Sequence, residues 1–191
     1  MKHLGLILFG IPAMMMAANL VEGNAKSPVR VVIYEDLQCP DCRDFRQMMD
    51  EKLLPKYAEQ VAFEHRDFPL AKHAWAREAA HAARFFELQN PKLGIEFRRQ
   101  TMAKIKEIKP DTLGNFVAEF ARKYAVDAVR AVEAMKDASL AAAVEKDFQE
   151  GVARGVSKTP TIFVDGEPFI ERFAYEDVAK TLDAALAARK K

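Results

Sequence analysis

The sequence predicts an α/β fold in which a βαβ unit and a C-terminal ββα unit are separated by an inserted helical subdomain. A β-branched apolar run at 28–37 precedes a helical pattern and a second apolar run at 61–68, which is typical of βαβ. Amphipathic segments fill the middle of the chain, and a hairpin pattern with one more helix ends it. With 191 residues, half of them hydrophobic, the chain is long enough for one continuous core.

The first unit begins with the strand PVRVVIYEDL at 28–37. From Pro40 the period changes, and apolar residues fall at helical spacing at Phe45, Met48, Met49, Leu53 and Tyr57. Pro55 lies near the predicted end of this helix. The strand VAFEHRDF at 61–68 follows, so short connections join strand, helix and strand into one βαβ unit.

The insertion is expected to extend from about 71 to 155 and to be helical. Asp111 is placed as an N-cap, and Gly155 is placed just past the end of the last helix. The amphipathic segments are predicted at 74–88, 93–108, 113–124, 128–135 and 139–153.

The sequence TPTIFVDGEPFI at 159–170 predicts a hairpin that turns at Asp165-Gly166. Pro168 has no N–H to donate to a neighbouring strand, so its strand is placed at the edge of the sheet. The last helix is predicted to start at Tyr175 and to carry apolar residues on one face, at Val178, Leu182 and Leu186.

Residues 1–25 have the layout of a secretory signal peptide: Lys2 and His3, an apolar run, and small residues before a cleavage site after Ala25. An uncleaved membrane anchor over 4–21 is the competing interpretation. It is weakened by its short length and by the residues Gly5, Gly10, Pro12 and Asn19. A cytosolic helix is favoured least. We therefore expect export to the periplasm or another extracytoplasmic space, with 26–191 as the mature domain.

The overall composition argues against a nucleic-acid partner and against a purely structural role for the two cysteines. Lysine plus arginine number 29 against 28 acidic residues, a net charge of +1, so no nucleic-acid partner is expected. Cys39 and Cys42 are the only cysteines, and a disulfide between them closes too small a loop to stabilise the fold much. A structural staple is therefore a poor explanation.

The motif CPDC at 39–42 stands at the start of the predicted helix, where both sulfurs lie on one face of the first turn. At the N-cap, Cys39 meets unpaired N–H groups and the helix dipole, which favour a thiolate. Cys42 is expected to be more buried and less acidic. Pro40 suits the first helical position because it has no N–H to leave unpaired. The difference in acidity and burial between the two cysteines suits thiol–disulfide exchange, in which Cys39 forms a mixed disulfide and Cys42 resolves it.

Two other interpretations of the cysteine pair stay open. A structural zinc site needs four ligands, and the histidines do not provide a second spaced pair, so zinc or copper binding is less favoured. Two inert packed cysteines are favoured least. His73 and His81 are placed in an alanine-rich helix, as surface or packing residues and not as catalytic ones.

Thr159-Pro160 opens the strand that is expected beside the first strand. Proline is allowed at the first residue of a strand, and an X-Pro bond adopts cis at a small free-energy difference. Beside a CxxC helix cap and ahead of a ββα ending, we favour cis over trans. The Thr159 backbone would then turn outward, ready to pair with an extended substrate segment.

Three stretches in this order, YEDLQCPDCRDF, RDFPLAKHAWAREAAHAA and GVSKTPTIFVDG, resemble the thioredoxin superfamily, and specifically its DsbA-like branch with an inserted helical domain. The resemblance places the thioredoxin-like parts at about 28–70 and 156–190. It implies an extracytoplasmic thiol–disulfide oxidoreductase in which Cys39 is the nucleophile, Cys42 resolves and Pro160 is cis.

The resemblance also implies what such a protein works with. Its substrates would be unfolded or partly folded secreted proteins, and a membrane partner would reoxidise it by passing electrons to quinone. No nucleotide or metal cofactor is implied, and we expect a monomer. Phe68 and Leu70 of the DFPL stretch are expected to pack the insertion against the sheet.

Pro40 and Asp41 are the expected redox-tuning residues, and Asp41 departs from the histidine or aromatic residue often found there in the family. A carboxylate about 6 Å from the Cys39 sulfur would repel its thiolate by roughly 1.4 kcal/mol at an effective dielectric constant of about 40. The helix dipole opposes this by about 0.3–2 kcal/mol. Because the two nearly cancel, we expect a milder oxidant than the strongest family members.

Glu35 and Asp36 precede the pair, but not at the six-residue offset of thioredoxin's buried acid, where this chain has Ile33. We expect both acids to be exposed or capping. The expected function is the introduction of disulfides into secreted proteins. A disulfide reductase or isomerase is the first alternative, and a non-catalytic thioredoxin-like protein that binds a metal or a peptide is the second.

Overall fold

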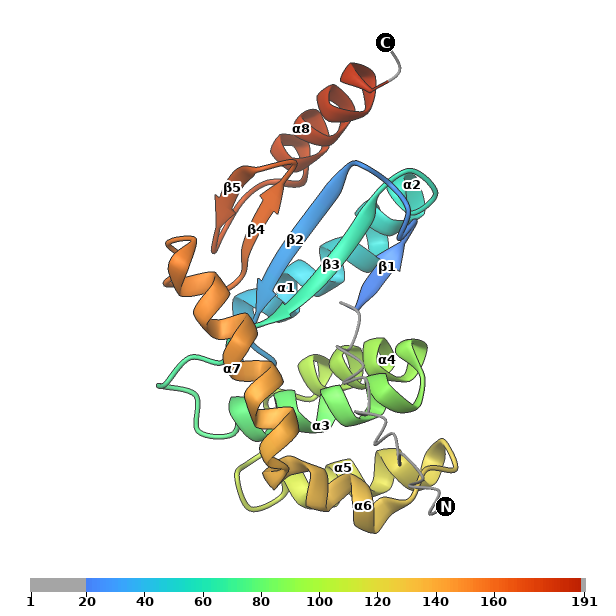
Figure 1. Cartoon of the computed structure of the whole chain (residues 1–191), viewed down its shortest axis with the longest axis vertical. Coiled ribbons are helices and arrows are strands. Elements are labelled where there is room, and N and C mark those ends of the chain that lie inside the picture. The colour runs from blue at the N-terminus through green and yellow to red at the C-terminus, as the bar shows by residue number, and fades with distance from the viewer. Residues whose placement is uncertain (1–19, 190–191) are drawn as a thin grey trace, which may run out of the picture.

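The computed structural model describes residues 20–189. Within this range a five-stranded mixed sheet has the strand order β1-β3-β2-β4-β5 (Figure 1). β2 pairs with β3 in parallel, and the other neighbouring strands are antiparallel. The strands are β1 (Val21–Gly23), β2 (Arg30–Glu35), β3 (Ala62–Asp67), β4 (Thr161–Val164) and β5 (Glu167–Ile170).

The helices follow the predicted order, with the insertion between β3 and β4. A continuous helix joins β2 to β3 through a π-helical turn, η1, which comes just before Pro55. The helices are α1 (Pro40–Met48), η1 (Met49–Leu53), α2 (Leu54–Tyr57), α3 (Ala76–Gln89), α4 (Pro91–Ala103), α5 (Leu113–Lys123), α6 (Ala128–Glu133), the 3-10 turn η2 (Ala134–Lys136), α7 (Ala138–Ala153) and α8 (Tyr175–Ala188).

The two faces of the sheet are covered by different helices. One face packs its β-branched residues against apolar side chains of α1, η1, α2 and α8. On the other face, Phe68 stacks on Phe148 of α7 at 4.5 Å between ring centroids, next to Leu70, as expected for the DFPL stretch. α7 approaches closely because Gly151 has no side chain: a Cβ there would lie 2.7 Å from the Phe68 ring.

The helices of the insertion lie beside the sheet (Figure 1). Their aromatic and aliphatic side chains form a second core, which also includes Leu37, Cys39 and Cys42. Two details differ from the sequence prediction. α4 ends at Ala103, earlier than the predicted segment 93–108, and the N-cap of α5 is Thr112, not Asp111. Gly155 has φ +81° just past α7, as predicted.

The C-terminal unit agrees with the hairpin prediction. Asp165 and Gly166 both have positive φ, 51° and 97°, as a tight turn between antiparallel strands requires. β5, which contains Pro168, is an edge strand. The final helix buries Val178 and Leu182 against the sheet.

The segment just before Lys26 is part of the folded domain, although the sequence analysis assigned it to the leader. β1 pairs with β3, with Glu22 opposite Phe63, and Leu20 is buried. The Asn24 N–H also donates to the Val61 carbonyl at 2.9 Å. Cleavage after Ala25 would therefore remove a strand of the sheet. Most of the predicted leader, residues 1–19, lies outside the described residues.

Candidate active site

The two cysteines begin α1 at one end of the sheet. Cys39 is the N-cap residue with an extended backbone (φ −86°, ψ 124°), and Pro40 takes the first helical position. Both cysteines are free thiols and both are largely buried, Cys39 at 5% and Cys42 at 1% relative exposure. They differ in access, because Cys39 lines a surface pocket and Cys42 does not.

The Thr159-Pro160 segment lies beside this pair because of the strand register. β4 runs antiparallel to β2 and begins at Thr161 opposite Tyr34, so the residues before β4 meet the residues after β2. The Thr159-Pro160 bond is cis, as predicted. The Cys39 thiol donates a hydrogen bond to the Thr159 carbonyl oxygen, with 3.2 Å between the two heavy atoms.

The pocket beside Cys39 has a volume of about 390 Å³. Its walls come from the start of α1, from the loop before α3, from the cis-proline segment and from the turn after β5. The lining residues are Cys39, Pro40, Asp41, Leu70, Ala71, Lys72, His73, Ser157, Lys158, Thr159 and Glu171. Four segments that are distant in sequence thus surround one sulfur.

Hydrogen bonds lower the pKa of Cys39 from 9.0 to about 6. The largest contribution is a hydrogen bond from the Cys42 thiol, which burial of Cys39 opposes. The Thr159 side chain adds to the effect: its buried hydroxyl has no partner among the described residues while Cys39 is a thiol, so it is free to donate to the thiolate. The backbone N–H groups of Cys42 and Asp41 contribute as well.

Cys42 titrates in the opposite direction. Burial raises its pKa well above 9.0, and the neighbouring Cys39 sulfur and the charge of Glu35 raise it further. The backbone N–H of Asp36 donates to the Cys42 sulfur at 3.4 Å. The pKa values of the two cysteines therefore differ more than the sequence analysis suggested. That analysis expected the helix dipole and the Asp41 charge nearly to cancel at Cys39.

Asp41 has a partner that the sequence analysis did not identify. Arg172, in the turn after β5, donates from Nε to Asp41 Oδ1 at 3.1 Å. The preceding residue, Glu171, has a positive φ of 57° and binds Lys158 through its carboxylate at 2.7 Å. Its N–H also donates to the Pro160 carbonyl. This turn therefore connects the CPDC segment to the cis-proline segment.

Glu35 and Asp36 correct the sequence expectation, because both are buried, at 4% and 1% exposure. The Asp36 carboxylate accepts hydrogen bonds from Gln38 N–H, from Leu70 N–H and from the His73 ring, each at 2.7 Å. Only the capping role was anticipated. Burial raises the pKa of Asp36, although these donors oppose the rise.

His73 also differs from its predicted place. It precedes α3 in the loop that lines the pocket, instead of lying on the helix. His81 does lie in α3 and is a packing residue, as expected: its Nδ1 contacts the Met135 carbonyl at 2.8 Å. The two histidines therefore occupy quite different environments.

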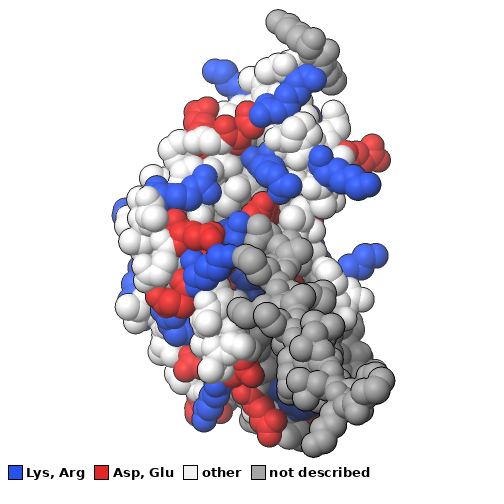
Figure 2. Space-filling model, in the orientation of Figure 1, with Lys and Arg blue, Asp and Glu red and all other residues white. Residues whose placement is uncertain are grey.

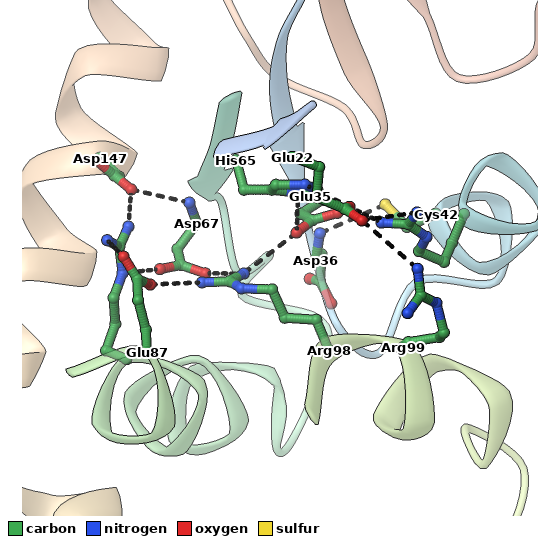
Figure 3. Close-up of polar contacts among 12 residues, drawn as sticks. Glu22, Glu35, Asp36, Cys42, His65, Asp67, Glu87, Arg98, Arg99 and Asp147 are labelled. Atoms are coloured by element: carbon green, nitrogen blue, oxygen red, sulfur yellow. Dashed lines mark hydrogen bonds and ion pairs between the residues drawn. The ribbon is translucent and has the colours of Figure 1, made fainter. Parts of the chain in front are cut away.

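A cluster of buried charges lies near Cys42, between the sheet and the insertion (Figure 3). His65 lies between two carboxylates, with Nδ1 3.0 Å from Glu35 and Nε2 3.0 Å from Glu22. Arg98 of α4 reaches Glu35 at 3.2 Å and Asp67 at 2.7 Å. These side chains come from β1, β2, β3 and α4.

The cluster keeps its members charged. Burial alone would lower the pKa of His65, but Glu35 and Glu22 outweigh it and raise that pKa to about 9. Burial would raise the pKa of Glu22, but His65 and Arg46 lower it to about 2. The pKa of Glu35 is lowered as well, because His65 and Arg98 outweigh its burial. An ionised Glu35 is thus held near Cys42.

Outside the site, positive and negative side chains are interspersed over the face shown in Figure 2. In residues 20–189, no three His, Cys, Asp or Glu side chains are grouped so that they could hold a metal ion. None of the helices in that range is long and apolar enough to cross a membrane.

A comparison with protein families matches residues 16–184 to a family model described as thioredoxin. The match spans most of the chain and includes the CPDC motif and the cis-proline segment. The chain belongs to the thioredoxin family.

Several solved structures share the fold of this thioredoxin-family chain. BdbD from Bacillus subtilis has a TM-score of 0.75 at 24% identity, covering 88% of this chain and 93% of its own. Alpha-DsbA1 from Wolbachia pipientis has a TM-score of 0.77 at 15% identity, covering 96% and 98%. A thioredoxin-like oxidoreductase from Silicibacter pomeroyi has 0.70 at 21% identity, covering 90% and 92%. The expected thioredoxin-like fold with a helical insertion is confirmed.

Curated relatives of this thioredoxin-family chain are much longer proteins. The sequence is 29% identical over 171 residues to the Na(+)/H(+) antiporter NhaA 3 of Salinispora tropica, and 28% over 172 residues to NhaA 1 of Salinispora arenicola. Each match covers 89% of this chain and 25% of the relative. The chain therefore spans about a quarter of the length of these relatives.

Of the residues that the sequence singled out for this thioredoxin-family site, Cys39, Pro40, Asp41 and Thr159 line one pocket. Cys42 lies behind them in the first turn of α1, and Pro160 forms the cis bond with Thr159. Sequence reasoning missed His73, Arg172 and the buried contacts of Asp36. The histidine of the PLAKH stretch was visible, but only the fold shows that its loop faces the nucleophile. Arg172 lies 131 residues from its partner and carried no sequence pattern.

Proposed function

We propose that the protein is an exported thiol–disulfide oxidoreductase that forms disulfides in unfolded or partly folded secreted proteins. Cys39 forms the mixed disulfide with a substrate and Cys42 resolves it. The observation that carries this proposal is the asymmetry of the pair: the pocket-lining Cys39 has a pKa of about 6, whereas burial raises the pKa of Cys42 well above 9.0. A reactive sulfur next to a protonated, buried one is the arrangement that exchange requires.

The redox state that the site stabilises supports the oxidising direction. A stabilised Cys39 thiolate exists only in the reduced protein, so it makes the disulfide form a better oxidant. A pKa of about 6 favours the reduced form at pH 7 by at most ~1.4 kcal/mol, or ~30 mV, and screening by solvent reduces this. We therefore expect a mild oxidant, with a potential between about −270 mV for thioredoxin and about −120 mV for the strongest oxidants.

Equilibration with glutathione redox buffers measures the potential and tests the direction. A value at or below that of thioredoxin would identify a reductase. Oxidative refolding of reduced ribonuclease and reduction of insulin test turnover, and Cys39→Ala should abolish both activities. If that variant matches the wild type in a peptide-binding assay and the wild type shows no turnover, the protein is a non-catalytic binder.

Reoxidation and export complete the proposal. Each disulfide given to a substrate leaves the pair reduced, so an oxidant is needed; the family resemblance makes a quinone-linked membrane protein the expected one. We expect the protein to act as a monomer, without a cofactor. The basic and apolar N-terminal sequence supports export by a leader, and the place of β1 in the sheet supports a leader that ends before Leu20.

A further inference from the structure

His73 lies at the wall of the pocket that contains the Cys39 sulfur. Its side chain is 14% exposed, and it belongs to the loop 70–73, which lines the pocket together with the cis-proline segment. An imidazole beside a reactive sulfur can exchange a proton with a molecule that enters the pocket.

Asp36 fixes which nitrogen of this ring is available. Its fully buried carboxylate accepts hydrogen bonds from the backbone N–H groups of Gln38 and Leu70. The His73 Nδ1 lies 2.7 Å from Asp36 Oδ2. A carboxylate surrounded by donors acts as an acceptor, so Nδ1 carries the proton and Nε2 is the basic nitrogen. His73 Nε2 has no hydrogen-bond partner among residues 20–189. A base oriented by a third group is the arrangement that activates nucleophiles in other enzymes.

We propose that His73 is a catalytic acid–base residue for the substrate thiol, positioned by Asp36; this rests on the proposed function. In the oxidising direction, His73 Nε2 takes the proton of the incoming thiol. The resulting thiolate attacks the Cys39 sulfur and forms the mixed disulfide, while the Cys39–Cys42 bond breaks. Cys42 leaves with the electron pair and takes a proton from water, while His73 returns its proton to water. His73 then takes the proton of a second substrate thiol, whose thiolate attacks the substrate sulfur and releases Cys39 as a thiolate, so that two electrons move from substrate to protein.

The chemistry of the substrate gives this base a purpose. A free cysteine has a pKa of about 8.5, so only about 3% is thiolate at pH 7, and the thiolate is the form that attacks. The charged groups that line the same pocket are Asp41, Lys72, Lys158 and Glu171. Asp41 and Glu171 are paired with Arg172 and Lys158, at 3.1 and 2.7 Å. Each of these carboxylates is thus held by a cation, whereas Asp36 holds His73 through Nδ1 and leaves Nε2 without a partner among residues 20–189.

The test uses the reverse half-reaction, because a residue that deprotonates an incoming thiol must protonate a leaving one. Reduced wild type and His73→Gln are mixed with two disulfides at pH 7. Bis(2-hydroxyethyl) disulfide releases a basic thiolate that benefits from an acid. Dithiobis(nitrobenzoate) releases an acidic thiolate that does not. We expect the variant to react at least ~10-fold more slowly with the first and within about twofold of wild type with the second.

Three further variants sharpen the result. Asp36→Asn, which leaves the ring unoriented, should show the same selective slowing. Lys72→Gln changes a charge in the same pocket, and His81→Gln removes a histidine from the insertion; neither should be selective. Equal rates for wild type and His73→Gln with both disulfides, or equal slowing with both, would overturn the inference. A wild type that reacts with neither disulfide would instead refute the proposed function.

Discussion

Asp41 and Arg172 are the residues that most change how the CPDC motif is understood. From the sequence, the Asp41 carboxylate should oppose the Cys39 thiolate. In the structure it is paired with Arg172, and the pKa of Cys39 is lowered to about 6 by hydrogen bonds that no motif could show. The Arg172 side chain is 86% exposed, so the pair contributes at most about 1 kcal/mol.

Removing Arg172 should therefore have a small effect that depends on Asp41. We expect Arg172→Ala to raise the pKa of Cys39 by up to about 0.7 units, because the uncompensated carboxylate disfavours the thiolate. Titration of the thiolate absorbance measures this pKa. In an Asp41→Asn background the same substitution should have no effect. An equal shift in both backgrounds would show that Arg172 does not act through Asp41.

The sequence-based hypothesis about Asp41 is tested in the same way. We expect Asp41→His to raise the reduction potential, measured against glutathione, because it removes a negative charge near the thiolate. Arg172→Ala serves as the comparison, since it should shift the potential the other way. An unchanged or lower potential in Asp41→His would reject the hypothesis that Asp41 makes the protein a mild oxidant.

His65 makes folding stability depend on pH. Its pKa is raised from 6.5 to about 9, so its charged form contributes stability that is fully present below pH 6.5 and lost as the pH rises through 9. We expect urea unfolding of the oxidised protein, in which the cysteines do not titrate, to show a loss on the order of 1–3 kcal/mol across this window. The loss should be much smaller in His65→Gln and unchanged in the control His81→Gln.

At the scale of elements, β1 is a short edge strand whose Glu22 takes part in the buried charge cluster. The Glu22 carboxylate contacts the side chains of His65 and Arg46. The Leu20 carbonyl, just before β1, accepts a hydrogen bond from the backbone N–H of His65 at 2.9 Å. A three-residue strand has little propensity of its own, so tertiary contacts hold it in place. The sequence analysis assigned it to the leader because it contains one of the small residues expected before a cleavage site after Ala25.

A chain that begins at Lys26 should therefore be less stable than one that begins at Leu20. We expect a difference of about 3–5 kcal/mol in the free energy of unfolding, because Arg46 and His65 lose a buried counter-charge. Urea unfolding of both chains measures it, and Glu22→Gln in the longer chain isolates the contribution of the charge. Equal stability of the two chains would mean that β1 is dispensable.

The same contact predicts where processing stops. If the protein is exported with cleavage, intact mass spectrometry should show a mature chain that still contains Leu20. A mature N-terminus at Lys26 would contradict this expectation.

At the scale of the whole molecule, buried charges connect the sheet to the insertion. From Glu35 the chain of contacts runs through Arg98 and Asp67 to Arg84 of α3, with Asp67 Oδ2 2.5 Å from Arg84 Nε, and on to Asp147 of α7. The cores of the sheet and of the insertion are separate clusters. Polar contacts therefore add specificity to the apolar packing of Phe68 on Phe148, where the insertion docks against the sheet.

Arg98 should be the most sensitive position in this network. Arg98→Ala leaves Asp67 and Glu35 buried with fewer partners, and we expect a loss of about 3–5 kcal/mol in the free energy of unfolding. The matched control is Arg77→Ala, which breaks the exposed pair with Glu145 and should lose less than about 1 kcal/mol. Similar losses for both variants would show that the buried network stabilises the fold no more than an exposed ion pair does.

The sequence by itself determined the order of elements, the place of the insertion and the two segments that carry the chemistry. Hydrophobic periodicity predicts helices and strands because it reports which face is buried, and CPDC and Thr159-Pro160 are local patterns with local consequences. Turn residues such as Asp165-Gly166 and Gly155 were predictable for the same reason: backbone conformation there depends on the residue itself.

Only the tertiary structure decided what surrounds the reactive sulfur. Glu35, Asp36 and His65 are polar residues that sequence statistics place outside, yet they are buried because partners from distant elements satisfy them. His73 and Arg172 also have partners that only the fold provides, because their contacts join segments 37 and 131 residues apart. Long-range electrostatic pairing has no period along a chain, so it becomes visible only when the chain is folded.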